Sequence, residues 1–273
     1  MSTEPSRPAR RRTVHDLQKL REENTPIVVA TAYDFPLARL LDESGVDLVL
    51  VGDSLGMVVQ GHDSTIPVTL DHMVYHAEMV GRAVRNAHVT VDLPFLSADV
   101  SPEQALISAG RLMQEGRAQS VKLEGGRRVL PQVRRLVESG VPVMGHLGLT
   151  PQSVHAFGGY RTQATDEAAQ EILIEDALAL QDAGAFALVL EKVPADFARR
   201  ATERLSIPTI GIGAGPGCSG QVLVSHDFLG LFDEFRPKFV RRYADLADQI
   251  RSASANYADD VRNRRFPSDD ESF

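Results

Sequence analysis

Short apolar runs alternate with longer segments of helical periodicity along most of the chain. Seven runs are rich in Val, Ile and Leu and do not alternate between apolar and polar residues, which is typical of strands buried on both faces. They cover residues 27–32, 47–51, 88–92, 120–123, 142–145, 185–190 and 207–212, and residues 221–224 are the candidate for an eighth. This order predicts repeated strand-helix units and a parallel sheet.

The segments between the runs carry the start and stop signals of helices. Helices are expected over residues 36–44, 70–86, 102–115, 129–139, 167–183 and 195–204, and a final one over 239–257, outside the barrel or against a neighbouring subunit. Ser101 before Pro102 is a typical helix start, Asp34 is expected to cap a helix, and glycine follows four of the predicted helices. We therefore predict a single-domain (β/α)8 TIM barrel with an extra C-terminal helix, and a doubly wound open sheet is the alternative.

Composition narrows the class of protein. The 273 residues include 37 acidic and 29 basic side chains, for a formal net charge of −8, and one cysteine. The acidic balance argues against nucleic-acid binding despite arginines at positions 7 and 10–12, and no apolar run approaches the roughly 20 residues that cross a bilayer. A single cysteine cannot form a disulfide within the chain and favours a reducing compartment. We expect a cytoplasmic protein with a disordered basic tail over residues 1–13, a catalytic barrel domain over 14–258 and a polar tail over 259–273.

Ionisable side chains stand at the ends of most predicted strands, where the loops of such a barrel build the active site. These side chains are Asp34, Asp53 beside Ser54, Asp92, Lys122 with Glu124, His146 and Glu191. If the strand ends converge, Asp53, Asp92 and Glu124 place three carboxylates around one point, where they repel one another unless a cation is bound. Oxygen ligands without cysteine or paired histidine favour Mg²⁺ over zinc. The sequence therefore predicts a magnesium site, beside which Lys122 would attract an anionic substrate.

Two segments are rich in glycine. In residues 211–217, Pro216 stands where the dinucleotide-binding fingerprint has its third glycine, so the segment is neither a Rossmann fingerprint nor a P-loop. Its glycines are expected to allow positive φ and close backbone approach beside the site. Residues 157–160, with 146–148, frame a candidate lid. Cys218 has no base partner in the sequence and is expected to be structural rather than nucleophilic.

Eight motifs follow one another in a fixed order. They are Thr31-Ala-Tyr-Asp34, Val51-Gly-Asp-Ser-Leu-Gly56, Gly61-His-Asp-Ser-Thr-Ile-Pro-Val-Thr-Leu70, Asp92-Leu-Pro-Phe95, Val121-Lys-Leu-Glu-Gly-Gly126, Gly145-His-Leu-Gly-Leu-Thr-Pro-Gln152, Leu188-Val-Leu-Glu191 and Gly211-Ile-Gly-Ala-Gly-Pro-Gly-Cys218. Over roughly residues 13–255, this series closely resembles the ketopantoate hydroxymethyltransferase family.

The resemblance implies a (β/α)8 barrel that transfers a hydroxymethyl group from 5,10-methylenetetrahydrofolate to 3-methyl-2-oxobutanoate in pantothenate biosynthesis. It implies one Mg²⁺ per subunit and a homo-oligomer, commonly a decamer. It also implies a role for each matching residue: Asp53 and Asp92 as magnesium ligands with Glu124 as the third acidic residue of the metal site, Asp53, Ser54, Asp92 and Lys122 as the 2-oxo acid site, Glu191 as proton acceptor, and His146 on the substrate side. Magnesium chelated by the substrate would acidify the C3 proton for removal by Glu191.

The chain departs from the family pattern at Lys192, at Ser97-Ala98 and at Ser219, none of which is a proposed ligand or base. Strand alternation is expected to point Lys192 away from the site. Two alternatives to the transferase stay open. One is a Mg²⁺-dependent carbon-carbon lyase or mutase of the phosphoenolpyruvate mutase and isocitrate lyase type, and the other is a catalytically silent 2-oxo acid binding protein.

Overall fold

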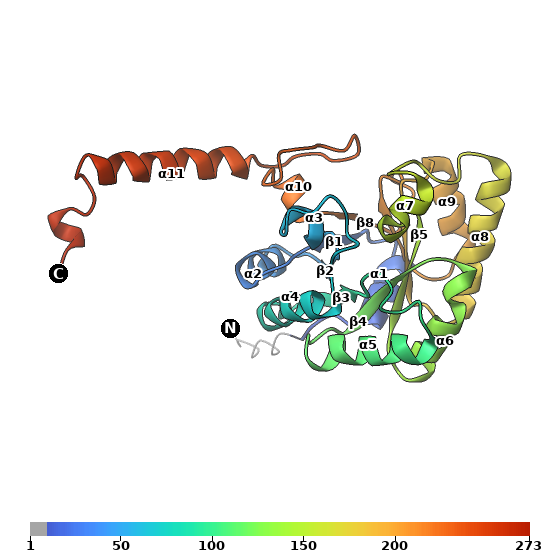
Figure 1. Cartoon of the computed structure of the whole chain (residues 1–273). Coiled ribbons are helices and arrows are strands. Elements are labelled where there is room, and N and C mark those ends of the chain that lie inside the picture. Colours follow the sequence, from blue (N-terminus) through green and yellow to red (C-terminus); the bar gives the residue numbers. More distant parts are fainter. Residues whose placement is uncertain (1–9) are drawn as a thin grey trace, which may run out of the picture. The chain divides into compact units, whose positions relative to one another are not determined.

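Eight parallel strands close into a barrel in the computed structural model, which describes residues 10–273 (Figure 1). The strands are β1 (Ile27–Thr31), β2 (Leu48–Val51), β3 (His88–Asp92), β4 (Ser120–Glu124), β5 (Val143–Gly148), β6 (Ala187–Glu191), β7 (Thr209–Ile212) and β8 (Gly220–Leu223). Each strand pairs with the next one in the chain, and β8 pairs with β1. The predicted barrel is confirmed, and the open sheet is wrong because such a sheet would leave two unpaired edge strands.

Helices surround the strands as the sequence predicts, with small shifts at their ends. They are α2 (Phe35–Glu43), α4 (Leu70–Ala83), α5 (Pro102–Gln114), α6 (Leu130–Glu138), α8 (Glu167–Asp182) and α9 (Ala195–Arg204). The Asp34 carboxylate accepts a hydrogen bond from the Leu37 backbone N–H, at 2.8 Å, and so caps α2. Shorter elements follow some strands: α3 (Leu55–Val58), α7 (Val154–Phe157) and the 3₁₀ turns η1 (Arg127–Val129) and η2 (Pro151–Ser153).

A further helix, α1 (Val14–Glu22), closes the amino-terminal end of the barrel. Leu17 is buried in the apolar cluster that contains Ile27 and Leu48, the first residues of β1 and β2. The helix lies outside the sequence prediction because Leu17 is its only buried residue, which is too little for a periodic signal. It begins at a capping box in which the side chains of Thr13 and Asp16 bond each other's backbone N–H groups.

The inner face of the barrel is polar along β3 and β4. These strands read His-Val-Thr-Val-Asp and Ser-Val-Lys-Leu-Glu, and every residue in them is buried. The Ser120 hydroxyl lies 2.9 Å from His88 Nε2 and 2.8 Å from Thr90 Oγ1, so the polar positions meet inside the barrel. The expectation of strands without alternation is therefore wrong for β3 and β4. A strand that is buried on both faces can alternate between apolar and polar residues where the buried polar side chains form hydrogen bonds with one another.

No helix connects β7 to β8; residues 213–219 make this crossover alone. A Cβ at Gly215 would lie 2.3 Å from Ala195 Cβ, and one at Gly217 would lie 2.7 Å from Arg199 Cβ. The segment therefore packs its backbone directly against α9, and Gly215 also has a φ of +76°. The glycines allow the close approach that the sequence predicts, but the approach is to a helix.

Residues Val224–Phe273 form a second compact unit with α10 (Ser225–Phe228), α11 (Leu246–Arg262) and the 3₁₀ turn η3 (Asp269–Glu271). The helix predicted over 239–257 is wrong at both ends, since α11 starts later and ends later. The preceding residues bond to the α10 region instead of continuing a helix: the Tyr243 N–H donates to Phe228 O at 2.7 Å. Within residues 10–273, no helix is long and apolar enough to cross a membrane.

Candidate active site

The predicted site residues lie together inside the carboxyl end of the barrel. Asp53 follows β2, Asp92 ends β3, Lys122 and Glu124 belong to β4, His146 belongs to β5 and Glu191 ends β6. All except Glu191 are at most 4% exposed, whereas the Glu191 side chain is 15% exposed. The cluster is therefore almost sealed from water, and Glu191 is its most accessible member.

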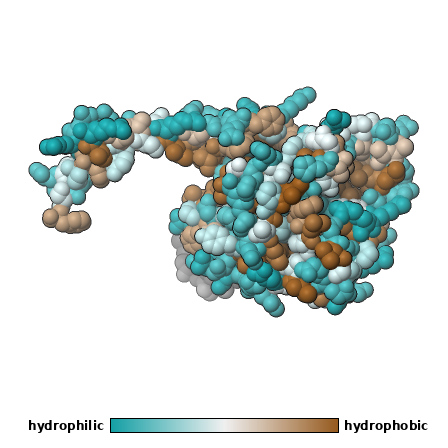
Figure 2. Space-filling model, viewed as in Figure 1, coloured by the Kyte–Doolittle hydropathy of each residue, from teal (hydrophilic) through white to brown (hydrophobic). Residues whose placement is uncertain are grey.

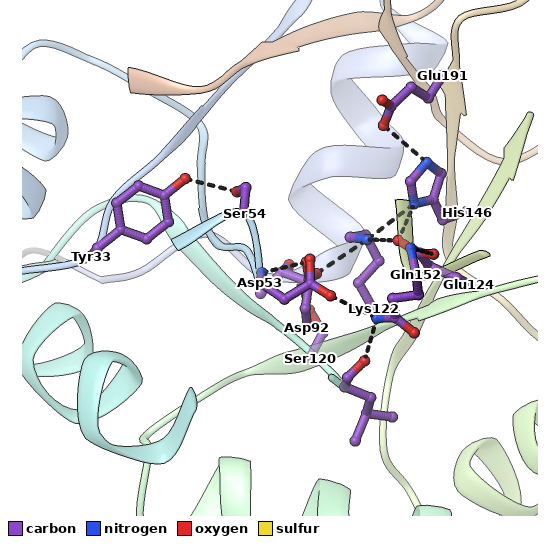
Figure 3. Close-up of polar contacts among 12 residues, drawn as sticks. Tyr33, Asp53, Ser54, Asp92, Ser120, Lys122, Glu124, His146, Gln152 and Glu191 are labelled. Atoms are coloured by element: carbon purple, nitrogen blue, oxygen red, sulfur yellow. Dashed lines mark hydrogen bonds and ion pairs between the residues drawn. The ribbon is translucent and has the colours of Figure 1, made fainter. Parts of the chain in front are cut away.

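The Lys122 ammonium group lies between the two aspartates on one side and His146 and Glu124 on the other (Figure 3). Its Nζ is 3.3 Å from Asp92 Oδ1, 3.9 Å from Glu124 Oε1 and 3.1 Å from His146 Nδ1. Burial lowers the pKa of Lys122, but the charges of Asp92, Glu124 and Asp53 outweigh it, so the pKa lies above its usual value. Lys122 therefore keeps its positive charge inside the cluster.

The three carboxyl groups around Lys122 do not ionise equally well. Burial, followed by the charges of Asp92 and Glu124, raises the pKa of Asp53 well above its usual value. Burial also raises the pKa of Asp92 despite the Lys122 charge. For Glu124 the hydrogen bond and charge of His146, with the charge of Lys122, outweigh burial and lower the pKa. One lysine thus leaves this group of acids short of positive charge.

The donor set and its electrostatics fit a hard cation. Asp92 Oδ1 is buried and accepts no hydrogen bond, so this oxygen has a lone pair that could bind a cation. Within residues 10–273, no group of three or more His, Cys, Asp and Glu side chains is already arranged around an ion position. Lys122 lies where these carboxylates face one another. An ion held here would compete with Lys122 for Asp92 Oδ1 and Glu124 Oε1.

His146 connects the carboxylate cluster to Glu191. Its Nδ1 lies 3.3 Å from Glu124 Oε1, and its Nε2 lies 3.3 Å from Glu191 Oε2. Burial and the Lys122 charge lower the pKa of His146, but Glu124 and Glu191 raise it further, so the pKa is above its usual value. The imidazole therefore has a carboxylate on each side and can orient Glu191 through Nε2.

Ser54 lies at the other side of the cluster, where α3 begins. Its Oγ is 2.8 Å from the hydroxyl group of Tyr33, which is buried in the loop after β1. Gly52 leaves room for this arrangement, since a Cβ there would lie 2.8 Å from Ser54 Oγ. Sequence reasoning missed Tyr33 as a site residue, although it stands in the first of the eight motifs.

Gln152 is the second site residue that sequence reasoning missed. Its Nε2 donates to Asp53 Oδ2 at 2.8 Å and to Leu93 O at 3.0 Å, while its backbone N–H donates to Glu124 Oε2 at 3.1 Å. Gln152 carries no charge and is 99 positions from Asp53 in the chain. Its place at the end of the sixth motif, six residues after His146, was the only available signal.

The segment after α7 contacts two other loops of the barrel. The Tyr160 hydroxyl is 3.5 Å from Asp63 O, and Lys192 Nζ donates to Tyr160 O at 2.5 Å. Burial, followed by the charges of Glu191 and Asp53, raises the pKa of Tyr160. Lys192 has a φ of +46° and lies just past β6, so strand alternation does not set its direction. Its ammonium group holds the candidate lid.

The Cys218 thiol lacks the lowered pKa of a reactive cysteine. Burial raises its pKa, which outweighs the hydrogen bonds of Thr202 and Thr209. A raised pKa keeps the thiol protonated, whereas a nucleophilic cysteine needs a lowered one.

Comparison with known proteins identifies the family. The family model for ketopantoate hydroxymethyltransferase matches residues 11–269. The chain belongs to the ketopantoate hydroxymethyltransferase family.

Curated relatives of this family align over nearly their whole length. The 3-methyl-2-oxobutanoate hydroxymethyltransferase of Moorella thermoacetica is 56% identical over 261 residues, which are 96% of this chain and 97% of the relative. The protein of the same name from Syntrophus aciditrophicus is 51% identical over 273 residues, covering both chains completely. This hydroxymethyltransferase family member therefore matches these two relatives over 96–100% of its length.

Solved structures outside the family share the fold. The 2,3-dimethylmalate lyase, a member of the PEP mutase/isocitrate lyase superfamily, has a TM-score of 0.60 and 17% identity, and the match covers 95% of this chain and 91% of that one. A phosphonopyruvate hydrolase in complex with oxalate and Mg²⁺ has a TM-score of 0.60 and 11% identity, covering 94% and 92%. At these identities the likeness concerns the barrel alone.

Proposed function

We propose that the protein transfers a hydroxymethyl group from 5,10-methylenetetrahydrofolate to 3-methyl-2-oxobutanoate, giving ketopantoate for pantothenate biosynthesis. The observation that carries this proposal is the buried cluster of acids around Lys122, joined through His146 to the more open Glu191. Family membership adds the substrate pair, because the curated relatives bear the name of this transferase. The aldol-type reaction needs a base at C3 and positive charge at the 2-oxo acid, and the cluster offers both.

Asp53, Asp92 and Glu124 are the residues that would hold Mg²⁺, one ion per subunit. When bound, the ion would supply positive charge that acidifies the C3 proton of a 2-oxo acid. Three buried carboxyl groups, two of them with a raised pKa, support this assignment, since a divalent cation relieves their repulsion. The absence of sulfur ligands favours a hard ion.

Glu191 is the proposed proton acceptor. Its Oε2 faces His146 Nε2 and its side chain is the most exposed of the cluster, so substrate can reach it from the mouth of the barrel. Glu191 would remove the C3 proton of 3-methyl-2-oxobutanoate, and C3 would form a bond to the methylene carbon of the folate. The two bonds from that carbon to the folate nitrogens would break, and water would supply the hydroxyl oxygen of the product. Tetrahydrofolate would leave, its nitrogens taking up the proton from C3 and one proton from water. His146 would hold the carboxylate in position during this transfer.

Lys122 and Ser54 are proposed to bind the 2-oxo acid together with Asp53 and Asp92. Lys122 provides a buried charge for an anionic group, and the Ser54 hydroxyl is positioned by Tyr33. Both lie beside the proposed metal ligands, so one small anion can contact all of them.

Deuterium exchange at C3 of 3-methyl-2-oxobutanoate in D₂O, followed by NMR, tests the base and the metal without folate. With Mg²⁺ present, we expect the native protein to catalyse this exchange. The exchange rate should fall by a factor on the order of 10² or more in Glu191→Gln, and it should fall as much in the native protein when Mg²⁺ is left out. Adding methylenetetrahydrofolate should then yield ketopantoate. A folded, metal-loaded protein that exchanges no deuterium and forms no ketopantoate would contradict the proposal. Such a result would favour the silent binding protein.

The lyase alternative shares the barrel but lacks support at the site. Enzymes of that type usually carry a reactive cysteine in a mobile loop after a strand, whereas burial raises the pKa of the Cys218 thiol. Cleavage of a carbon-carbon bond in a 2-alkylmalate, without folate, would establish the lyase instead.

The protein is further proposed to be a cytoplasmic homo-oligomer, with a decamer as the family-based expectation. The single cysteine supports a reducing compartment. Support for the oligomer comes from α11, which has no buried residue although it carries Ile250, Tyr257 and Val261. Figure 2 shows apolar surface among the hydrophilic residues of this helix.

A further inference from the structure

Each carboxylate of the cluster has one oxygen engaged by an N–H donor. Asp53 Oδ2 accepts from Gln152 Nε2 at 2.8 Å, and Glu124 Oε2 accepts from the Gln152 backbone N–H at 3.1 Å. Asp92 Oδ2 accepts from the Asp53 backbone N–H at 3.0 Å. All three residues are 3% exposed, so water does not replace these donors easily. Three acids therefore each present one committed oxygen and one oxygen for another partner.

The second oxygens of Asp92 and Glu124 face a common cationic group. Asp92 Oδ1 and Glu124 Oε1 lie 3.3 Å and 3.9 Å from Lys122 Nζ, and Asp92 Oδ1 makes no hydrogen bond. In Asp92 and Glu124, one carboxylate oxygen therefore accepts a hydrogen bond from an amide N–H, and the other faces the positive charge of Lys122. A carboxylate with one oxygen bound to an N–H group offers an ion only its other oxygen. If the ion contacted both oxygens, it would compete with the N–H group for one of them.

Gln152 supplies two of the three donors, and its side chain is fixed. Besides Asp53 Oδ2, Nε2 donates to Leu93 O at 3.0 Å. The Leu93 carbonyl oxygen can only accept a hydrogen bond, so the amide nitrogen of Gln152 rather than its oxygen must face it. The residue thus ties the loop after β2 to the one after β3 through its amide, and to β4 through its backbone.

We propose that Gln152 determines which ion the site accepts, by holding Asp53 as a single-oxygen ligand. Mg²⁺ prefers six ligands at about 2.0–2.1 Å and binds carboxylates through single oxygens. Ca²⁺ takes six to eight oxygen ligands at about 2.3–2.6 Å and often binds both oxygens of a carboxylate. A cluster restricted to one oxygen per acid disfavours Ca²⁺. Gln152 is a positioning residue in this scheme, and the proposal rests on the metal site of the proposed function.

Metal titration of the purified protein tests this role. Mn²⁺ binding is followed by electron paramagnetic resonance of the free ion, with Mg²⁺ and Ca²⁺ as competitors, for the native protein and Gln152→Met. Methionine matches the length of glutamine, removes the amide donor and keeps the backbone N–H that holds Glu124. We expect Gln152→Met to bind Mg²⁺ roughly tenfold more weakly and Ca²⁺ no more weakly, so the preference for Mg²⁺ over Ca²⁺ falls by roughly tenfold.

Gln119→Met is the matched control. The Gln119 amide also makes two hydrogen bonds, to Arg12 O at 3.1 Å and from the Val89 N–H at 3.2 Å, but it stands before β4, away from the acids. This variant should keep the native ion preference. If Gln152→Met does not fold, Gln152→Asn, whose amide is one methylene shorter, takes its place in the same titration.

A native ratio of Mg²⁺ to Ca²⁺ affinity in Gln152→Met would overturn the role of Gln152 and leave the metal site intact. Equal weakening of both ions would also overturn it, since that result indicates a purely structural contribution. If the native protein and Asp53→Asn bind Mn²⁺ equally poorly, the metal site itself is wrong, and the proposal falls with it.

Discussion

Lys122 shows how a single residue decides the state of the site. The side chain is buried between acids whose mutual repulsion and burial raise the pKa of Asp53 and Asp92. The same negative charges raise the pKa of Lys122, because they favour its charged form whereas they disfavour the charged form of an acid. Lysine is therefore the internal counter-ion of the cluster when no metal is bound.

Lys122→Met should destabilise the metal-free protein by about 3 kcal/mol, because removing one partner leaves buried acids unpaired. Added Mg²⁺ should restore much of this loss, since the ion supplies the missing charge and binds only the folded state. Urea unfolding with and without Mg²⁺ measures both effects. An equal loss in the two conditions would show that the lysine contributes packing rather than charge.

His88 gives the fold a dependence on pH away from the site. Burial lowers its pKa from 6.5 to about 4, and the histidine lies 2.9 Å from Ser120 Oγ and 3.1 Å from Arg12 O. The unfolded chain therefore binds a proton at a higher pH than the folded one, and this contribution to stability is complete above pH 6.5 and lost as pH falls toward 4.

We expect His88 to account for about 3 kcal/mol of destabilisation between pH 7 and pH 4, from about 1.4 kcal/mol per pKa unit. His88→Gln should lower stability at pH 7 but flatten the pH dependence by that amount. Urea unfolding of both proteins across this range measures the difference. Parallel curves for the two would mean that His88 is not the titrating group.

At the scale of elements, the crossover from β7 to β8 depends on bare backbone against α9. Gly215 and Gly158 have similar φ values of +76° and +65°, but only Gly215 has a neighbour within reach of a Cβ, Ala195 at 2.3 Å. Gly158 and Gly215 therefore distinguish two reasons why a position needs glycine: a left-handed backbone conformation, and lack of space for a Cβ atom.

Gly158→Ala should cost about 1 kcal/mol, from the left-handed conformation alone. Gly215→Ala should cost roughly 3 kcal/mol, because α9 or the segment must also shift. Chemical denaturation of the two variants measures these costs. Similar costs for both would show that α9 moves aside without penalty.

At the scale of the whole molecule, α11 carries large apolar side chains that are 44–60% exposed, namely Ile250, Tyr257 and Val261. Ile250, Tyr257 and Val261 recur at helical spacing on one side, and the helix has no buried residue. Such a face is stable in water only at a cost, and contact with a second copy would remove it.

Ile250→Glu combined with Val261→Glu should lower the assembly size in sedimentation equilibrium, since two charges would be buried in the proposed contact. Ser252→Glu adds a charge to a different side of α11 and should leave the assembly unchanged. An unaltered mass for the double variant would exclude this face from the oligomer contact.

The sequence by itself determined the barrel and most of the residues that meet in it. Strand ends could be located because buried strands leave apolar runs, and parallel strands of a barrel all end at one edge. That rule brought Asp53, Asp92, Glu124 and Glu191 to one place without any knowledge of distances. Capping followed equally well, since the bond from Asp34 to Leu37 spans only three residues.

Only the tertiary structure decided which of these groups touch, and what holds them. Gln152 is 99 positions from Asp53, and its role depends on a turn that aims one uncharged amide at a carboxylate. Lys192 reaches Tyr160 because its backbone leaves the strand with a positive φ, and α11 starts late because the residues before it bond to α10. Periodicity records which side of an element is buried; contacts between distant loops depend on geometry that no local pattern contains.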